Sequence, residues 1–466
     1  MRKASKKVKS PAAVGKKRLT LLEQINFNAA GLDVGSREHW VAVPVDRDPQ
    51  PVRCFGTFTS DLHALADWLL QCGVKSVAME STGVYWIPVF QILEGRGLEV
   101  LLVNARHVKN VSGRKSDVSD CQWLQQLHAA GLLQPSFRPP DALCAIRTLL
   151  RYRDDLVTQG ATQIQHMQKA LSQMNLHLQH VLSDITGVSG LRILDAILAG
   201  ERDPEKLALL RDQNVKASQA DVVAALTGDW RPEHLFVLRQ AREHYRYFQS
   251  QLAACDAEVA RLLAALDGQA DPKDAPLPPK NAPRGKQRKN QIRLPETDLR
   301  VELFRILGTD ATQVPGLGPA TVAQLLSELG PHLKESFATV GRFTSWQGLC
   351  PDPKKSGGRT LRDQKRGVKH RVGQLFREAA QSLHASQTAL GEFYRRIRSR
   401  WGGKAAVAAT AHKLARIFYH LVTTKQAYDE SVFAEATARH DQRRLKNLRK
   451  TLRQLGYDMV PRPGVS

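Results

Sequence analysis

The stretch NAAGLDVGSREHWVAVPV, residues 28–45, contains two short apolar runs separated by a polar turn. The runs at 28–34 and 39–45 have the length and composition of buried β-strands. A third run of the same kind, VRCFGTF, follows at 52–58. The first domain is therefore expected to begin with three consecutive strands.

Helical and strand patterns alternate after these three strands. Leu62, Leu65 and Leu69 fall on one side of a helix expected over 61–71, with Ser60 at its N-cap position. The expected elements continue as a strand at 75–79, a helix at 84–95, a strand at 98–103 and a helix at 117–131. Three strands followed by alternating helices and strands predict a mixed sheet covered by helices.

The remainder of the chain is expected to be helical, which makes the whole an α/β domain followed by all-α regions. Apolar residues recur at coiled-coil or bundle spacing within 142–182, at Leu149, Leu156, Ile164, Leu171 and Leu178. The expected organisation is a basic arm at 1–24, the α/β domain at 25–140, a helical region at 141–267, a Pro- and Lys-rich linker at 268–297, a helical domain at 298–430, and a basic helix and tail at 431–466.

An excess of basic residues predicts a polyanionic partner. The 466 residues include 68 Lys and Arg against 45 Asp and Glu, a formal charge of +23. Nucleic acid is the favoured partner, ahead of a membrane surface, because no stretch reaches the roughly 18 apolar residues of a spanning helix. Six scattered cysteines without a CxxC pair indicate reduced thiols in a cytosolic protein and argue against zinc.

Four carboxylates occupy positions from which they can meet. Asp33 ends the first strand, Glu80 ends the fourth, and Asp117 and Asp120 stand on one face at the start of a helix. Each position alone is more typical of a turn residue or a helix cap. Converging carboxylates repel one another unless a divalent cation neutralises them, and oxygen ligands suit Mg²⁺. Their joint placement is that of the ribonuclease H-like fold as RuvC-type junction nucleases use it.

The stretch from Gly31 to Cys121 resembles the DEDD transposases of bacterial insertion sequences, the family that includes the Piv DNA invertase. The family motif E-x-T-G-x-Y corresponds to Glu80–Tyr85, and K-[ST]-D-x-x-D corresponds to Lys115–Asp120. The resemblance implies a RuvC-like domain in which one or two Mg²⁺ ions are bound by Asp33, Glu80, Asp117 and Asp120. Cys121 stands where the family often has alanine, and its small apolar side chain predicts no loss of function.

The C-terminal domain carries a glycine-rich turn and a basic serine segment. VPGLGPATVAQLL at 314–326 is similar to half of a helix-hairpin-helix, in which Gly316 and Gly318 leave amides open to a phosphate; the alternative is an ordinary turn between helices. A loop is expected at 350–367. In it, Lys354, Lys355 and Arg359 surround Ser356, cations that favour phosphate binding and an activated hydroxyl, although KKSGGR alone is typical of a solvated loop.

The same family has an S-G-G motif in its C-terminal domain, preceded by a Pro-rich turn and followed by K-x-G. Here these are Pro351 and Pro353, Ser356-Gly357-Gly358 and Lys365-Arg366-Gly367. The resemblance implies that Ser356 is the nucleophile that becomes joined to DNA. Nucleic acid is expected to contact Lys115, Gly316, Gly318, Lys354, Lys355, Arg359, Lys365 and Arg366.

The resemblance, which covers roughly 28–425, also implies partners. Some family members are guided by a structured bridge RNA that pairs with donor and target DNA. A basic chain without a recognition helix or finger for base readout fits such delegated recognition. The expected partners are donor DNA, target DNA and a guide RNA, in the bacterial cytoplasm at the nucleoid. Because recombination joins four DNA ends, a homodimer or homotetramer is expected, with 142–182 at the interface.

Three interpretations stay open at the level of sequence. The first is a recombinase that uses Ser356 together with a metal-assisted RuvC-like domain. The second is a metal-dependent nuclease, a junction resolvase, in which Ser356 is not catalytic. The third is a nucleic-acid scaffold without catalysis, which the complete acidic set argues against because acids near phosphates weaken binding. A covalent protein–DNA adduct separates the first from the second.

Overall fold

The computed structural model describes residues 24–81, 83–103, 117–273, 277, 290–350, 352–356, 359–364 and 370–457. For residues 117–119, 352–356, 359–364, 434–441, 443 and 444 the description covers the backbone alone. The chain divides into two compact units, with the boundary between Arg138 and Pro139. No helix within the described ranges is long and apolar enough to cross a membrane.

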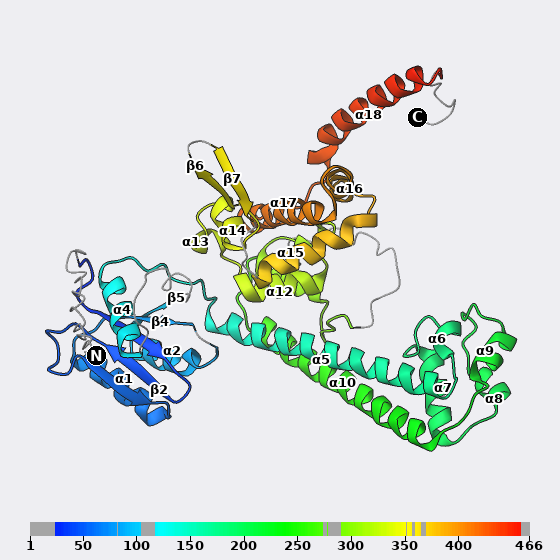
Figure 1. The fold of residues 1–466 in the computed structure, drawn as a ribbon, viewed down its shortest axis with the longest axis horizontal. Helices are drawn as coiled ribbons and strands as arrows, with labels where there is room; N and C mark the ends of the chain where they lie inside the picture. The colour runs from blue at the N-terminus through cyan, green and yellow to red at the C-terminus, as the bar shows by residue number, and fades with distance from the viewer. Residues whose placement is uncertain are drawn as a thin grey trace, which may run out of the picture. The chain divides into compact units, whose positions relative to one another are not determined.

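The first unit is built on the mixed sheet that the sequence predicts (Figure 1). Its strands are β1 Ala29–Val34, β2 Glu38–Ala42, β3 Val52–Gly56, β4 Ser76–Glu80 and β5 Glu99–Val103. They lie in the order β3-β2-β1-β4-β5, in which β1, β2 and β3 pair antiparallel and β4 lies parallel to both β1 and β5. This is the ribonuclease H-like strand order, and the expected succession of strands and helices is confirmed.

Helices cover the two faces of this sheet. One face carries the apolar core, to which β1 contributes Leu32 and Val34, and β4 contributes Val77 and Met79. The helices α1 Thr59–Gln71 and α2 Trp86–Gly95 supply the rest of that core. The opposite face is covered by α4 Asp117–Ala129, whose Gln125 donates a hydrogen bond to the carbonyl of Ala29 at 3.3 Å. Because side chains alternate along a strand, residues 31 and 33 of β1 face α4.

The start of α1 corrects one expectation. Ser60 was expected at the N-cap, but the helix begins at Thr59 with Phe58 as its N-cap. The Asp61 carboxylate accepts a hydrogen bond from the Phe58 amide at 3.1 Å, which satisfies the open backbone group and extends the helix by two residues at this end.

The second unit opens with a hairpin of two long helices, α5 Asp141–Gln173 and α10 Pro232–Ala264. Contacts between Leu149 and Cys255 and between Gly160 and Phe248 show that the helices run antiparallel. The coiled-coil spacing is thus satisfied within one chain. The helix expected over 142–182 ends earlier, at Gln173, because Asn175 adopts a left-handed conformation with φ of 57°. Four short helices close the far end of the hairpin around a common core: α6 Leu178–Val181, α7 Val188–Ala199, α8 Pro204–Ala208 and α9 Gln219–Leu226.

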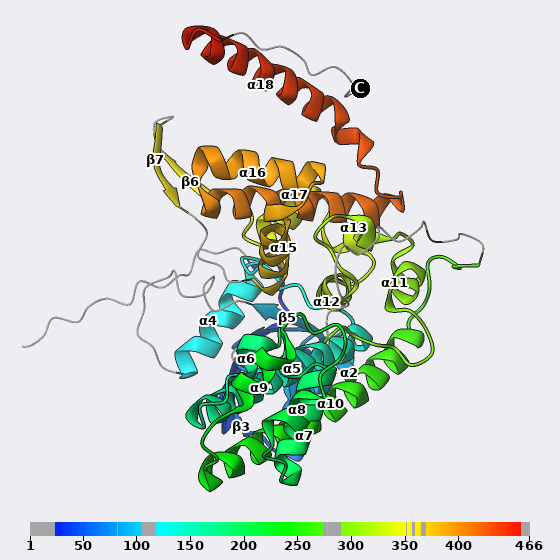
Figure 2. The same cartoon turned by 90° about the vertical axis from the view of Figure 1, so that its right-hand side faces the viewer.

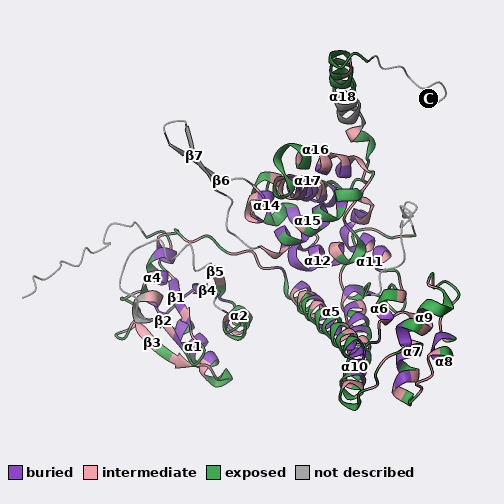
Figure 3. Ribbon diagram, turned by 45° about the vertical axis from the view of Figure 1, so that its right-hand side comes forward, coloured by how far each residue is buried: buried purple, intermediate pink, exposed green. Residues whose placement is uncertain are grey.

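A helical assembly follows the hairpin, as expected. Its elements are α11 Leu299–Leu307, η1 Ala311–Gln313, α12 Pro319–Leu329, α13 Leu333–Ser336, α14 Val340–Trp346, α15 Arg371–Ser382, η2 Leu383–Ala385, α16 Ala389–Trp401 and α17 Gly403–Thr424. The central helix is α17, which packs against α14, α15 and α16 and has a buried face that includes Leu414 and Phe418 (Figures 2 and 3). After η3 Ser431–Phe433, the basic helix α18 spans Ala434–Gln454, with Leu445 and Leu448 each about half exposed.

The serine segment departs from the expected loop. The strands β6 Asp352–Ser356 and β7 Arg359–Gln364 form an antiparallel hairpin in which Ser356 pairs with Arg359. A Gly-Gly pair between two strands is a signal for a two-residue hairpin turn. The segment was expected to be a loop because its flanking residues are charged and lack the apolar alternation of a buried strand.

Candidate active site

Two of the four predicted carboxylates stand at the ends of neighbouring strands. Leu32 of β1 pairs with Met79 of β4 in parallel register, so Asp33 and Glu80 follow at the same level. Leu32 and Met79 belong to the apolar core, and alternation along the strands directs Asp33 and Glu80 to the opposite face. The carboxyl ends of these strands therefore present two acids toward the face that α4 covers.

The third acid comes from α4, which lies close against the sheet. Gly31 of β1 faces the helix, and His128 near the end of α4 makes a 2.9 Å hydrogen bond with Ser76 of β4. These contacts hold the helix across β1 and β4, with Asp120 in its first turn. Asp117 is the first residue of α4, and its side chain lies outside the description. Lys115 also lies outside the described residues.

The pKa of the Cys121 thiol reflects the negative charge of the carboxylates in this region. Cys121 is fully buried, and burial, together with the negative charges of Asp33 and Asp120, raises the pKa of its thiol to about 12. The thiol is therefore a neutral, inert group under the influence of two carboxylates. Both acids act on the same buried atom, which places β1 and the first turn of α4 at one site.

The described residues contain no group of three His, Cys, Asp or Glu side chains close enough to hold a metal ion. Two described acids at adjacent strand ends and a third on the covering helix nevertheless provide oxygen ligands of the type that divalent cations take. Without a cation, such carboxylates repel one another.

The two glycines of the turn in the second unit differ: Gly316 is closely packed, and Gly318 is open to solvent. Gly316 has a φ of 91°, and a Cβ there would meet the carbonyl oxygen of Ala379 in α15 at 2.9 Å, so it serves helix packing. Gly318 is the exposed N-cap of α12, and a Cβ there would meet no atom within 4 Å. Of these two glycines, Gly318 is the one with open space beside a helix N-terminus.

The basic residues around the serine are distributed along the hairpin. Lys354, Lys355 and Ser356 belong to β6, Arg359 begins β7, and the register shifts between Lys354 and Lys355. Such a shift marks a β-bulge, which changes the twist of the hairpin near its serine end. Lys365 and Arg366 fall outside the described part of the chain.

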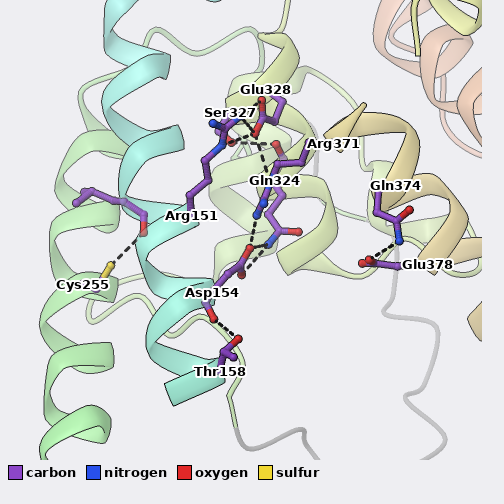
Figure 4. A network of polar contacts seen from close by, with 11 residues as sticks. Arg151, Asp154, Thr158, Cys255, Gln324, Ser327, Glu328, Arg371, Gln374 and Glu378 are labelled. Carbon is purple, nitrogen blue, oxygen red and sulfur yellow. Dashed lines mark hydrogen bonds and ion pairs between the residues drawn. The ribbon is translucent and has the colours of Figure 1, made fainter. Parts of the chain in front are cut away.

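A polar network that the sequence did not reveal joins α5, α12 and α15 (Figure 4). Arg151 of α5 binds Glu328 of α12 through two nitrogens, the closest contact being 2.7 Å. Asp154 accepts hydrogen bonds from Gln324 at 2.9 Å and pairs with Arg371, the first residue of α15. Burial raises the pKa of Asp154, and the Arg371 guanidinium opposes that rise. The network joins Arg371, which comes after the serine segment in the sequence, to the long helix α5 of the same unit.

Buried polar groups also lie where α14 ends and α15 begins. The ring of His370 packs on Trp346 with 3.9 Å between ring centres, and burial lowers the pKa of His370. Gln347 is fully buried, and within the described ranges neither its amide atoms nor Nδ1 of His370 has a hydrogen-bond partner. The sequence gives little indication of this buried pair, because polar residues beside an aromatic one are common in many loops.

Comparison with known proteins agrees with this architecture. Residues 30–176 match a family model described as a DEDD-type IS110 transposase, and residues 310–395 match the transposase family IS116/IS110/IS902. The chain is 25% identical over 351 residues, 71% of its length and 77% of the relative's, to an insertion element IS116 uncharacterized 44.8 kDa protein of Streptomyces clavuligerus. The fold and both matches define a transposase, an enzyme that cleaves and transfers DNA strands. The chain belongs to the IS116/IS110/IS902 family of insertion-element transposases.

The matched segments contain the predicted site residues. The first match includes Asp33, Glu80, Asp117 and Asp120, and the second includes the glycine turn and Ser356. A DEDD transposase implies a divalent metal ion, and its substrate is DNA.

Proposed function

We propose that this transposase cuts and rejoins the strands of its insertion element with Ser356 as nucleophile and the DEDD carboxylates as the metal-binding set. The observation that supports the proposal most directly is the parallel register that sets Asp33 beside Glu80 on the face covered by α4. The division into arm, RuvC-like domain, helical region, linker, serine domain and basic tail belongs to the same proposal.

The residues that would hold the metal are Asp33, Glu80, Asp117 and Asp120. Carboxylate oxygens suit Mg²⁺, and neutralisation of their mutual repulsion favours its binding. When bound, the ion stabilises negative charge on the scissile phosphate. The buried, neutral thiol of Cys121 does not compete as a ligand because its raised pKa keeps it protonated.

Ser356 supplies the reaction that the carboxylates cannot. Its Oγ forms a bond to the scissile phosphorus, one deoxyribose oxygen leaves, and the serine proton passes to an acceptor and then to that oxygen. The phosphodiester is exchanged for a phosphoserine ester, so the strand remains ready for joining without another energy source. Joining reverses the step, when the hydroxyl of a second strand attacks the ester and releases Ser356.

Basic residues would hold the phosphates beside the scissile bond. In this proposal Lys354, Lys355 and Arg359 of the hairpin, together with Lys365 and Arg366, contact the DNA backbone, and Lys115 does so at the metal site. The open amide at Gly318 offers a further phosphate contact, to which Gly316 contributes through the turn.

Target choice is assigned in this proposal to a structured guide RNA paired with donor and target DNA. The supporting features are a formal charge of +23 and the lack of a finger motif or DNA-recognition helix in the sequence. We further propose a homodimer or homotetramer in which the α5 region forms the interface, acting at the bacterial nucleoid.

Denaturing electrophoresis tests the proposal. The full-length protein is mixed with Mg²⁺, end-labelled DNA of the element ends and the RNA transcribed from the element's non-coding end. A labelled species that survives denaturation, disappears after protease treatment and maps to Ser356 is expected. Metal-dependent cleavage without any such adduct would favour the alternative, a RuvC-like nuclease in which Ser356 is not catalytic. Adduct formation without RNA would remove the guide from the proposal.

A further inference from the structure

The turn between α16 and α17, two helices that lie side by side (Figure 2), presents an exposed tryptophan. Trp401 is the last residue of α16, and 68% of its surface is exposed. Gly402 and Gly403 follow, and a Cβ on either would meet no atom within 4 Å. Tryptophan has a large apolar surface that proteins usually bury in a core. Here it lies at an open turn, so its flat ring is available to a ligand.

Cations without acidic partners flank Trp401 in the sequence. Arg398, Arg400 and Lys404 are all exposed, and none of them forms an ion pair among the residues that the structure describes. The sequence contains no Asp or Glu between Glu392 and Asp429. The guanidinium of Arg400 lies 5.8 Å from the centre of the Trp401 ring. The surface thus combines an aromatic face with uncompensated positive charge.

This combination has a specific chemical complement. An exposed aromatic ring among cations is the arrangement by which proteins bind single-stranded nucleic acid, since bases stack on the ring and phosphates meet the cations. Bases inside an intact duplex offer no such face, whereas nucleotides released from pairing do. An exposed apolar residue without charged neighbours would instead be an ordinary surface feature.

We propose that Trp401 stacks on an unpaired base of the DNA substrate, while Arg398, Arg400 and Lys404 bind the phosphates on either side. Transfer of a strand from one partner to another unpairs nucleotides beside the break, and the stack would hold one such nucleotide. The inference rests on DNA as the substrate and not on Ser356 or a guide RNA. The tryptophan also lies outside residues 310–395, the segment matched by the second family model.

Binding of a labelled single-stranded oligodeoxythymidine to the full-length protein tests the stack. Trp401→Ala is expected to weaken binding about 5- to 100-fold, the loss of one stacked base, and Trp401→Phe to restore most of it. Phe58→Ala, a change at a residue with 79% exposure beside an acidic helix start, serves as the matched control and should leave binding unchanged. Equal affinity of Trp401→Ala and the unaltered protein would overturn the proposal.

Photocrosslinking locates the contact directly. An oligonucleotide carrying 5-iododeoxyuridine is irradiated with the unaltered protein, which is then digested with trypsin. Cleavage after Arg400 and Lys404 should release the peptide Trp401–Lys404 with the nucleotide attached. Attachment exclusively at other peptides contradicts the proposal, and so does crosslinking of this peptide by 5-iodouridine RNA but not by DNA. Thermal unfolding of Trp401→Ala is expected to match the unaltered protein, because the ring is exposed.

Discussion

Gly31 of β1 lies directly against Cys121 of α4. A Cβ at position 31 would come within 2.2 Å of the Cys121 carbonyl oxygen and 2.3 Å of the Gln125 amide nitrogen. Only a residue without a side chain lets the helix approach the sheet this closely. The approach brings the first turn of α4, with Asp120, to the strand end that carries Asp33. Gly31 does not have a positive φ, yet it sets the distance between β1 and α4 and thereby the spacing of the acidic residues that they carry.

Gly31→Ala is expected to push α4 away from the sheet because both nearest atoms belong to the helix backbone and cannot rotate aside. The free energy of unfolding should fall by about 1–3 kcal/mol, as for other overpacked sites, and DNA cleavage should be lost. Chemical denaturation and a strand-cleavage assay measure the two effects. Gly95→Ala is the control, since a Cβ there meets nothing within 4 Å and should be tolerated. Unchanged cleavage by Gly31→Ala would mean that the helix spacing does not determine the site.

Asp33→Asn keeps the size of the side chain but removes its charge, so it is expected to abolish strand cleavage and exchange. Binding of element-end DNA should persist, because the basic surface is unchanged. Cleavage is measured at several Mg²⁺ concentrations and binding by filter retention. Asp46→Asn, a change at a well-exposed acid in the same domain, provides the charge control. Cleavage by Asp33→Asn at the normal rate would exclude this residue from the metal-binding set.

The sheet could be predicted from the sequence because its signals are local. The apolar runs around Leu32 and Met79 are bounded by polar turns, and each gives a strand at the expected place. The close packing at Gly31 could not be predicted, since it depends on a helix about ninety positions later in the chain. The start of α1 at Thr59 also escaped prediction, because an acid in the first turn outweighed the stronger N-cap residue Ser60.

The network of α5, α12 and α15 predicts a stability effect at Glu328. This carboxylate is only 8% exposed and accepts hydrogen bonds from Arg151. Glu328→Gln should lower the free energy of unfolding by about 1–3 kcal/mol, toward the smaller figure because Arg151 is half exposed to solvent. Chemical denaturation measures the loss, and a double-mutant cycle with Arg151→Gln isolates the pair. Glu335→Gln, whose parent side chain is 80% exposed, should have no measurable effect.

Buried histidines predict a loss of stability in mild acid. Burial lowers the pKa of His128 below its ordinary value of 6.5, and the charge of Glu99 only partly opposes this. The unfolded chain then binds the proton more readily, so the contribution of neutral His128 is fully present above pH 6.5 and is lost as the pH falls from there through the folded-state pKa. His39 and His370 shift in the same direction for the same first cause.

His128→Gln retains a polar partner for Ser76 but removes the titrating group. Its free energy of unfolding should therefore decline less than that of the unaltered protein between about pH 7.5 and about pH 5.5. Equilibrium denaturation at the two pH values gives the comparison, and His332→Gln, at a side chain with 62% exposure, is the control. A variant with the same slope as the unaltered protein would show that His128 does not contribute to the acid sensitivity.

The site itself was less predictable from the sequence than the sheet. Asp33 and Glu80 stand at strand ends whose pairing follows from the strand order, so their proximity could be expected. The hairpin that carries Ser356 departs from the expected loop, because the residues of its two strands lack the apolar alternation from which a strand is predicted. The attachment of α15 through Arg371 and Asp154 joins residues more than two hundred positions apart, and no local pattern encodes such a pair.

Ser356→Ala is expected to remove both recombination and the covalent adduct while leaving assembly with nucleic acid intact. The substitution removes only the hydroxyl group that the proposed reaction needs, and the cations of the hairpin remain. Quantitative recombination, adduct formation and complex assembly are measured on the same preparation. Ser345→Ala, a change at a serine in the preceding helix α14, controls for a general effect on the serine domain. Normal recombination by Ser356→Ala would leave the metal-dependent nuclease mechanism in its place.

Mixing Ser356→Ala with Asp33→Asn then tests whether one chain must supply both groups. Neither variant alone is expected to recombine DNA, because strand cleavage in the proposed mechanism needs both the metal-binding acids and the serine nucleophile. In a mixed oligomer, a subunit that retains Asp33 can act with a subunit that retains Ser356. Partial activity of the mixture, near one quarter to one half of the unaltered protein if subunits exchange at random, would show that the two groups act from different chains. An inactive mixture in which exchange has been verified would assign both groups to the same chain.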